Sequence, residues 1–212
     1  MAEPEIIPID DPAAPAAAAR AIAAGGVIAF PTDTVYGVGV GLWQPDAVAR
    51  LYVLKGRPEE KALPVLLADE AEWTRVACDV PEAAVRLMRA FWPGALTIVL
   101  PRRSDVPDAV APLAPTVALR VPAHEPLRRV LARTGPLATS SANRTGAPPA
   151  SDTATVRATL GVGLALLLAG GALPPSAPST VVDASGHEPA ILRHGAIADD
   201  AIWRVLTLPA PR

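Results

Sequence analysis

Short apolar runs recur along the chain, and most of them end at a proline, a glycine or a polar turn. Several are rich in Val and Ile, which is typical of buried strands. The pattern predicts strands at 27–30, 64–67, 96–100, 116–121, 137–140, 164–168, 180–183 and 190–193. A polar turn at 32–37 follows the first of them.

Between these runs, apolar residues recur at the spacing of an amphipathic helix, as Val48, Leu51 and Tyr52 do. Asp46 and Asp79 are expected to cap two of the helices. The pattern predicts helices at 13–24, 46–54, 70–76, 81–91, 127–132, 155–160 and from Asp199 to about 206. Mixed strands and helices without an internal repeat indicate the α/β or α+β class. We expect a single domain over 1–212, with its core at about 15–197 and a C-terminal helix and tail at 198–212.

Composition narrows the class of protein. With 212 residues, 50% hydrophobic and 19% charged, the chain can bury a sizeable core. A net charge of −2 does not favour an avid nucleic-acid binder. Cys78 is the one cysteine, so neither an intramolecular disulfide nor a cysteine metal cluster can form. An acidic N-terminus and apolar runs far below the roughly 20 residues that span a bilayer predict a cytoplasmic protein without membrane association.

The basic residues are unevenly divided between arginine and lysine. The chain has 17 arginines and two lysines, and both lysines, Lys55 and Lys61, fall within 55–61. A compact ammonium fits sites that a planar guanidinium fits poorly, so this segment is a candidate site. Chance placement on a solvated loop is the alternative.

Familiar catalytic and nucleotide-binding motifs are missing from the sequence. There is neither a Walker A pattern nor G-x-G-x-x-G nor G-x-S-x-G. The histidines, His124, His187 and His194, stand apart from other metal-ligating residues at useful spacing. We therefore expect no metal site built from protein ligands.

Polar residues near the ends of predicted strands are the remaining candidates, because ligands bind at strand ends in open α/β sheets. They offer hydroxyl, amide and cationic donors that suit a phosphate or carboxylate. The residues at strand ends are Thr32, Thr34, Ser141, Asn143, Ser179 and Arg193, and the further cationic donors considered with them are Lys55, Arg57, Lys61 and Arg120. No strong general base stands out, so the chemistry expected is phosphoryl-type transfer driven by positioning and charge neutralisation. Structural alternatives remain: Thr32 and Thr34 as turn formers, Asn143 in a left-handed turn, and Arg120 in an ion pair.

Five segments, in this order and spacing, closely resemble the threonylcarbamoyl-AMP synthase family, which has the YrdC-like fold. They are 26–37 (GVIAFPTDTVYG), 54–58 (LKGRP), 91–97 (FWPGALT), 140–146 (SSANRTG), and 179–183 (STVVD) with 191–195 (ILRHG). The Lys-x-Arg and Ser-x-Asn pair is the family's signature. The resemblance covers about residues 15–197 and is closest to the family's short form.

The resemblance implies a twisted mixed sheet flanked by helices around an open, positively lined cavity. It implies that L-threonine takes up bicarbonate or CO2 as a carbamate, which attacks the α-phosphorus of ATP. Pyrophosphate leaves, Mg²⁺ carried by ATP balances the charge, and the product is threonylcarbamoyl-AMP. A separate transferase complex then uses that product to modify tRNA.

Residue roles follow from the resemblance by position. ATP binding falls to Arg57, Lys61, Thr116, Ser141, Asn143 and Arg193. Threonine binding falls to Thr34, Arg120, Thr139 and Ser179. Lys55 and Arg57 are the expected catalytic residues, with Lys55 facing the phosphates or the carbamate.

Three positions depart from the family pattern: Leu66 replaces a histidine, Pro149 a serine, and His194 a proline. The first two bear on the amino-acid pocket and on one nucleotide contact. Two other functions stay open: a non-catalytic protein that binds double-stranded RNA or tRNA, and a paralogue that makes a different carbamoyl-adenylate. Weak RNA binding by the enzyme itself is also possible, through surface arginines.

Overall fold

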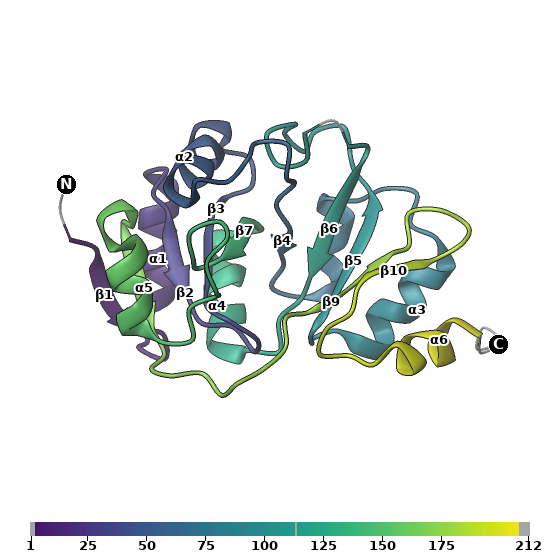
Figure 1. Cartoon of the computed structure of the whole chain (residues 1–212). Helices are drawn as coiled ribbons and strands as arrows, with labels where there is room; N and C mark the ends of the chain where they lie inside the picture. The colour runs from purple at the N-terminus through teal and green to yellow at the C-terminus, as the bar shows by residue number, and fades with distance from the viewer. Residues whose placement is uncertain (1–2, 113, 208–212) are drawn as a thin grey trace.

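A computed structural model describes residues 3–112 and 114–207, and in these ranges the strands form one mixed ten-stranded sheet (Figure 1). The strand order is β1-β8-β2-β3-β7-β4-β6-β5-β9-β10. The strands are β1 (Glu5–Pro8), β2 (Ile28–Phe30), β3 (Gly37–Gly41), β4 (Val65–Leu66), β5 (Leu96–Pro101), β6 (Thr116–Arg120), β7 (Leu137–Ser141), β8 (Leu166–Ala169), β9 (Thr180–Asp183) and β10 (Ala190–Arg193). The α-helices are α1 (Ala14–Ala23), α2 (Pro45–Lys55), α3 (Glu82–Phe91), α4 (Glu125–Thr134), α5 (Thr153–Leu160) and α6 (Asp199–Thr207), and the 3₁₀ turns are η1 (Glu70–Arg75) and η2 (Gly161–Gly163).

The sequence pattern predicted all of these strands except β1 and β3, and the fold class is confirmed. β3 reads Gly-Val-Gly-Val-Gly, a composition that favours turns over strands. Gly37 and Gly39 are needed because the Phe30 ring packs over them, whereas Gly41 lies against the Gln44 side chain. A Cβ on Gly37 would lie 2.9 Å from Phe30 Cε2. Close packing against the ring therefore overrides the poor strand propensity of glycine.

Two predicted helix caps are wrong. The N-cap of α2 is Gln44, and Asp46 lies inside the first turn. α3 begins at Glu82 after Pro81, while Asp79 adopts φ 46° in the preceding turn. A proline replaces the expected arrangement in both places, because Pro45 is the first residue of α2 and Pro81 is itself the N-cap of α3. The segment expected as a helix at 70–76 is the 3₁₀ turn η1.

The core consists of two clusters on opposite faces of the sheet. Ala29 belongs to the larger cluster, whereas its neighbours Ile28 and Phe30 belong to the smaller one. Since successive strand residues point to opposite faces, the clusters cover both sides. α1 and α4, which pack together, cover the smaller cluster, and α2 and α3 contribute to the larger one.

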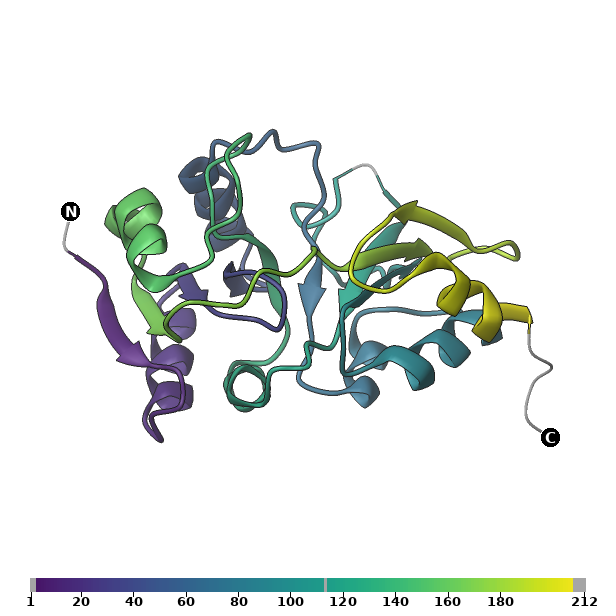
Figure 2. The same cartoon turned by 60° about the horizontal axis from the view of Figure 1, so that its bottom comes forward.

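The middle of the sheet is its thinnest part. β4 has two residues, and it pairs in parallel with β6 and antiparallel with β7. The chain between β8 and β9 crosses this middle region as an extended segment (Figure 2). Short strands and a crossing segment leave space here for a cavity.

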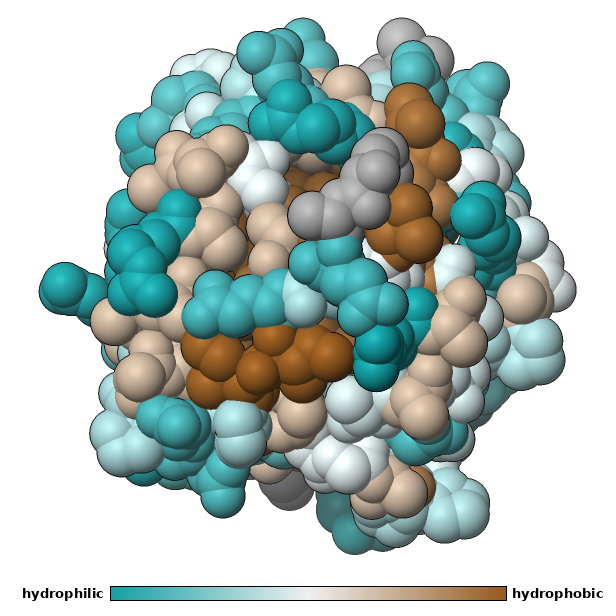
Figure 3. All heavy atoms as spheres, turned by 90° about the vertical axis from the view of Figure 1, so that its left-hand side faces the viewer, coloured by the Kyte–Doolittle hydropathy of each residue, from teal (hydrophilic) through white to brown (hydrophobic). Residues whose placement is uncertain are grey.

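The end of the sheet that carries β1 and α5 faces the viewer in Figure 3, where apolar patches interrupt a polar surface. Ile6 of β1 is 42% exposed, and Val162 of η2 is 66% exposed. The amides of Glu5 and Ile9 bond to the β8 side, so the outer edge falls to Ile6 and Pro8. Pro8 has no N–H to donate, which disfavours a further strand at this edge.

Within the described ranges, we find no helix with the length and apolar character needed to span a membrane.

Candidate active site

A cavity of about 260 Å³ lies at the thin middle of the sheet. It combines three guanidinium groups with hydroxyls and an apolar floor. The residues that line it are Phe30, Thr32, Thr34, Val35, Gly37, Arg57, Pro64, Leu66, Thr97, Arg120, Thr139, Ser140, Ser141, Pro149, Pro178, Ser179 and Arg193. Sequence analysis had placed Thr34, Arg57, Arg120, Thr139, Ser141, Ser179 and Arg193 in one site, and the structure brings them together.

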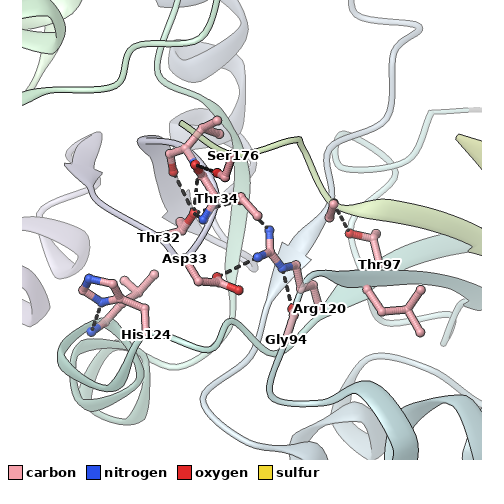
Figure 4. A network of polar contacts seen from close by, with 12 residues as sticks. Thr32, Asp33, Thr34, Gly94, Thr97, Arg120, His124 and Ser176 are labelled. Carbon is pink, nitrogen blue, oxygen red and sulfur yellow. Dashed lines mark hydrogen bonds and ion pairs between the residues drawn. The ribbon is translucent and has the colours of Figure 1, made fainter. Parts of the chain in front are cut away.

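Arg120, at the end of β6, is 6% exposed and is held at three nitrogens (Figure 4). Nε donates to Gly94 O at 2.9 Å, and Nη1 donates to Thr34 Oγ1 at 3.0 Å. Nη2 forms an ion pair with Asp33 Oδ1 at 2.6 Å. Burial lowers the pKa of Arg120, and the Asp33 carboxylate opposes that shift. The ion pair considered as a structural alternative is therefore present, and it fixes the guanidinium on the cavity wall.

The turn after β2 is organised by its own threonines. Thr32 Oγ1 accepts from the amides of Thr34 at 3.0 Å and Val35 at 3.1 Å, and it donates to Val35 O at 2.7 Å. Ser176 Oγ, from the crossing segment, donates to Thr34 O at 2.5 Å. Thr32 thus acts as a turn former, as the structural alternative proposed, and this turn carries the Thr34 hydroxyl to Arg120.

A second polar group lies around Ser179, which precedes β9. Its hydroxyl is 2.8 Å from Thr97 Oγ1 of β5. Arg193, at the end of β10, donates from Nη2 to Ser179 O at 2.8 Å and to Ser179 Oγ at 3.0 Å. Burial lowers the pKa of Arg193, and the nearby charge of Arg120 lowers it further. Both guanidinium groups therefore stand to gain from an anion between them.

Arg57 reaches the cavity from the segment after α2. Its Nε donates to Lys61 O at 3.0 Å, and its Nη2 donates to Ala62 O at 2.8 Å. Burial lowers the pKa of Arg57. Lys61 is exposed and is absent from the cavity lining; its carbonyl, rather than its ammonium, supports Arg57.

Lys55 differs from its expected placement. It is 2% exposed, and it does not line the cavity. Its Nζ donates to the carbonyls of Ser141 and Asn143, the latter at 2.6 Å. Burial, and after it the nearby charge of Arg57, lower the pKa of Lys55 to about 8. The ammonium lies beneath the loop after β7 instead of facing the cavity.

Asn143 and Thr116 also lie outside the cavity lining. Asn143 Nδ2 donates to Arg144 O at 2.8 Å and to Ala147 O at 2.7 Å, which closes its own loop. Among the described residues, none forms a hydrogen bond with the buried Asn143 Oδ1, and Asn143 borders a separate hollow beside α5. Thr116 begins β6, the strand that Arg120 ends, so the two residues lie at opposite ends of it.

Sequence reasoning missed Asp33 and Thr97 as members of the site. Asp33 lies between two singled-out threonines, and this position was the signal that could have identified it. Thr97 sits in a strand rich in β-branched residues, where a functional threonine looks like a structural one. Leu66 and Pro149, which depart from the family pattern, both line the cavity.

The cavity carries a surplus of positive charge. Of the carboxylates in the described ranges, Asp33 is the one that forms an ion pair with any of the three lining arginines. The same ranges contain no group of three His, Cys, Asp or Glu side chains that could hold a metal ion. The arrangement suits an anionic ligand with several oxygen atoms.

Comparison with known proteins gives a consistent result. The model of the Sua5/YciO/YrdC family, described as telomere recombination, matches residues 20–195. A threonylcarbamoyl-AMP synthase of Bacillus subtilis is 38% identical over 197 residues, covering 90% of this chain and 56% of that protein.

Two solved structures share the fold. Pyrococcus abyssi Sua5 complexed with L-threonine superposes with a TM-score of 0.86 and 34% identity over 90% of this chain and 56% of that chain. Escherichia coli YciO superposes with a TM-score of 0.85 and 26% identity over 95% of this chain and 100% of that chain. The chain thus spans little more than half of the Bacillus and Pyrococcus proteins but all of YciO. A family match over residues 20–195, which is most of the sequence, shows that the chain belongs to the Sua5/YciO/YrdC family.

Proposed function

We propose that this protein is an L-threonylcarbamoyladenylate synthase. It joins L-threonine, bicarbonate or CO2, and ATP to form threonylcarbamoyl-AMP and pyrophosphate. The observation that carries the proposal is the placement of Arg57, Arg120 and Arg193 on one cavity with one paired carboxylate. Two anionic substrates and a departing pyrophosphate need such a surplus of positive charge.

The threonine end of the cavity is assigned to Arg120, Thr34, Thr139 and Ser179. A guanidinium has five N–H donors, and Arg120 uses one at each of its nitrogens for the protein. The remaining two N–H groups can grip the amino-acid carboxylate. The hydroxyls of Thr34 and Ser179 then orient the amine toward the centre of the cavity.

The phosphate end is assigned to Arg57, Arg193 and Ser141. The carbamate oxygen attacks the α-phosphorus, the bond from that phosphorus to the bridging oxygen breaks, and pyrophosphate leaves. Arg57 and Arg193 stabilise the charge that develops on the phosphates. Asp33 is committed to Arg120, so we expect Mg²⁺ to arrive bound to the ATP phosphates and not to a protein cluster.

ATP cannot be held by the cavity alone. Its volume of about 260 Å³ is below the roughly 300–1,000 Å³ typical of pockets for drug-sized ligands. We propose that the adenosine part extends beyond it toward Asn143, Thr116 or Lys61, the ATP-binding positions that lie outside the lining. Occupation of the hollow at Asn143 would supply a partner for the buried Oδ1.

The test is pyrophosphate release by purified protein with ATP, Mg²⁺ and bicarbonate, comparing L-threonine, L-serine and no amino acid. We expect release that requires both threonine and bicarbonate. Release with a different amino acid would favour the paralogue, for which Leu66 on the cavity wall is the observation in favour. No release with any amino acid, together with RNA binding that weakens steeply with salt, would favour the non-catalytic RNA-binding protein.

The wider setting is part of the same proposal. The product would pass to a tRNA threonylcarbamoyl transferase complex in the cytoplasm, where ATP and tRNA are available.

A further inference from the structure

Lys55 is joined to the 141–145 segment by three hydrogen bonds, two from its side chain and one to its backbone. Its Nζ donates to Ser141 O and to Asn143 O. Its own carbonyl accepts from the amide of Thr145 at 2.9 Å. Ser141, the last residue of β7, leads into the loop after that strand and lines the cavity.

The chain turns sharply after Lys55. Gly56 ends α2 in the left-handed region at φ 57°, where glycine is favoured. Arg57 can therefore point into the cavity while Lys55 stays buried beneath the loop. The two cations of the Lys-x-Arg pair thus meet different parts of the molecule.

The chemistry of the contact explains why lysine stands here in an arginine-rich chain. A buried ammonium needs hydrogen-bond acceptors, and two carbonyls from alternate loop residues supply them. An ammonium can donate in three directions from one atom, whereas a guanidinium needs a flat and wider space. The loop carbonyls are in turn held together by a charge-assisted bond, which is stronger than a neutral one.

We propose that Lys55 is a positioning residue whose ammonium holds the 141–145 loop in the shape that presents Ser141 to the cavity, without touching the reacting atoms. The role in catalysis rests on the proposed function, but the structural role does not. This positioning role replaces the expectation from the sequence that Lys55 faces the phosphates or the carbamate.

Hydrogen–deuterium exchange of the ATP-free protein tests the structural role. In Lys55→Met, we expect amides in 140–147, with Thr145 as the reporter, to exchange faster by about tenfold or more, since a hydrogen bond to a charged group contributes about 1.5–3 kcal/mol. Lys55→Gln, which keeps an amide donor, should lie between Met and the wild type. The control is Arg50→Met on the same helix, because Arg50 also donates to a loop carbonyl, Gly25 O at 2.8 Å, and lies outside the cavity lining.

A residue that binds phosphate would behave differently. Its loss would leave exchange in 140–147 unchanged without ATP and alter it once ATP is added; that result overturns the proposal. Steady-state kinetics give the second measurement. We expect Lys55→Met to raise KM for ATP and lower kcat with little change in KM for threonine, and Lys55→Arg not to rescue either. If the wild type releases no pyrophosphate at all, the proposed function fails while the exchange measurement still decides the role of Lys55.

Discussion

The guanidinium of Arg120 is held by Asp33, Thr34 and Gly94, which lie far from it in the sequence, whereas that of Arg57 donates to two carbonyls within five residues of itself. Arg120 ends a central strand and is 6% exposed. Arg57 lies in an irregular segment and is partly exposed. The guanidinium at one end of the cavity is thus held by partners from distant parts of the sequence, and the guanidinium at the other end is held by its own short segment.

This difference matches the two ligands proposed. A small carboxylate is recognised best by donors whose positions are set before binding, because little order is then lost. A triphosphate changes shape and charge during the reaction, so a less constrained cation can follow it. We infer that selectivity for the amino acid resides at Arg120 and that handling of the phosphates resides at Arg57.

The strongest test of the fixed end is Arg120→Lys. A lysine keeps the charge but cannot reach three partners and a carboxylate together. We expect kcat/KM for threonine to fall by about 10²–10³-fold, since truncating one partner of a buried charge pair costs about 2–5 kcal/mol. Arg128→Lys is the matched control, because Arg128 also joins a carbonyl and a carboxylate but lies outside the cavity lining. Equal losses in both variants would show a general effect on stability and remove the special role of Arg120.

Substitution of Arg57, at the less constrained end of the cavity, should change KM for ATP. Arg57→Ala is expected to raise KM for ATP by roughly 10- to 100-fold, the value of a hydrogen bond to a charged group, with KM for threonine nearly unchanged. Arg50→Ala removes similar bonds from Nε and Nη2 to a nearby carbonyl outside the cavity lining and serves as the control. If Arg57→Ala raises KM for threonine as much as it raises KM for ATP, the division of the cavity into a threonine end and a phosphate end is wrong.

The contrast between the two ends also marks what the sequence could predict. Apolar runs identified β2, β5, β6 and β7 because their burial is written in local composition. The positions of Arg120, Ser179 and Arg193 in the family pattern predicted that they share one site. The partners that fix these residues were not predictable, because Asp33 and Gly94 meet Arg120 only through tertiary pairing.

Lys55 shows the opposite failure. The uneven use of lysine pointed to a special position, and that position is special. The direction of its side chain depends on the turn at Gly56 and on two backbone carbonyls, which carry no sequence signature. Residue type therefore predicted that geometry mattered here but not which partner it served.

A smaller effect is expected from pH at Lys55. Burial lowers its pKa from 10.5 in the unfolded chain to about 8, so the ammonium is intact below pH 8 and is lost above it. Burial lowers the pKa of the nearby Arg57 and raises the pKa of Tyr52. We expect kcat/KM for ATP to fall by up to about tenfold per pH unit above pH 8 in the wild type, and to stay flat in Lys55→Met.

Stability should change in the other direction over the same window. The folded protein releases the Lys55 proton at lower pH than the unfolded chain does. The free energy of unfolding therefore increases, and the protein becomes more stable, as pH rises from about 8 toward 10.5. Below pH 8 this increase is absent. Denaturant unfolding of the wild type and Lys55→Met at pH 7, 8 and 9.5 measures it, and parallel curves for the two proteins would contradict the assignment.

The smallest effect concerns the hydroxyl pair of Thr97 and Ser179, which line the same cavity as Arg120. Thr97→Val keeps the shape of the side chain and removes the 2.8 Å hydrogen bond to Ser179 Oγ. Ser179 Oγ still accepts from Arg193, so the loss should be confined to about 0.5–1.5 kcal/mol, or roughly a two- to tenfold rise in KM for threonine. A double-mutant cycle with Ser179→Ala separates the pair from each residue alone. Coupling in KM for threonine, without coupling in KM for ATP, would place both hydroxyls at the Arg120 end of the cavity. Coupling in both KM values would mean that the two ends share one rigid wall. In that case the contrast between Arg120 and Arg57 would have no functional meaning.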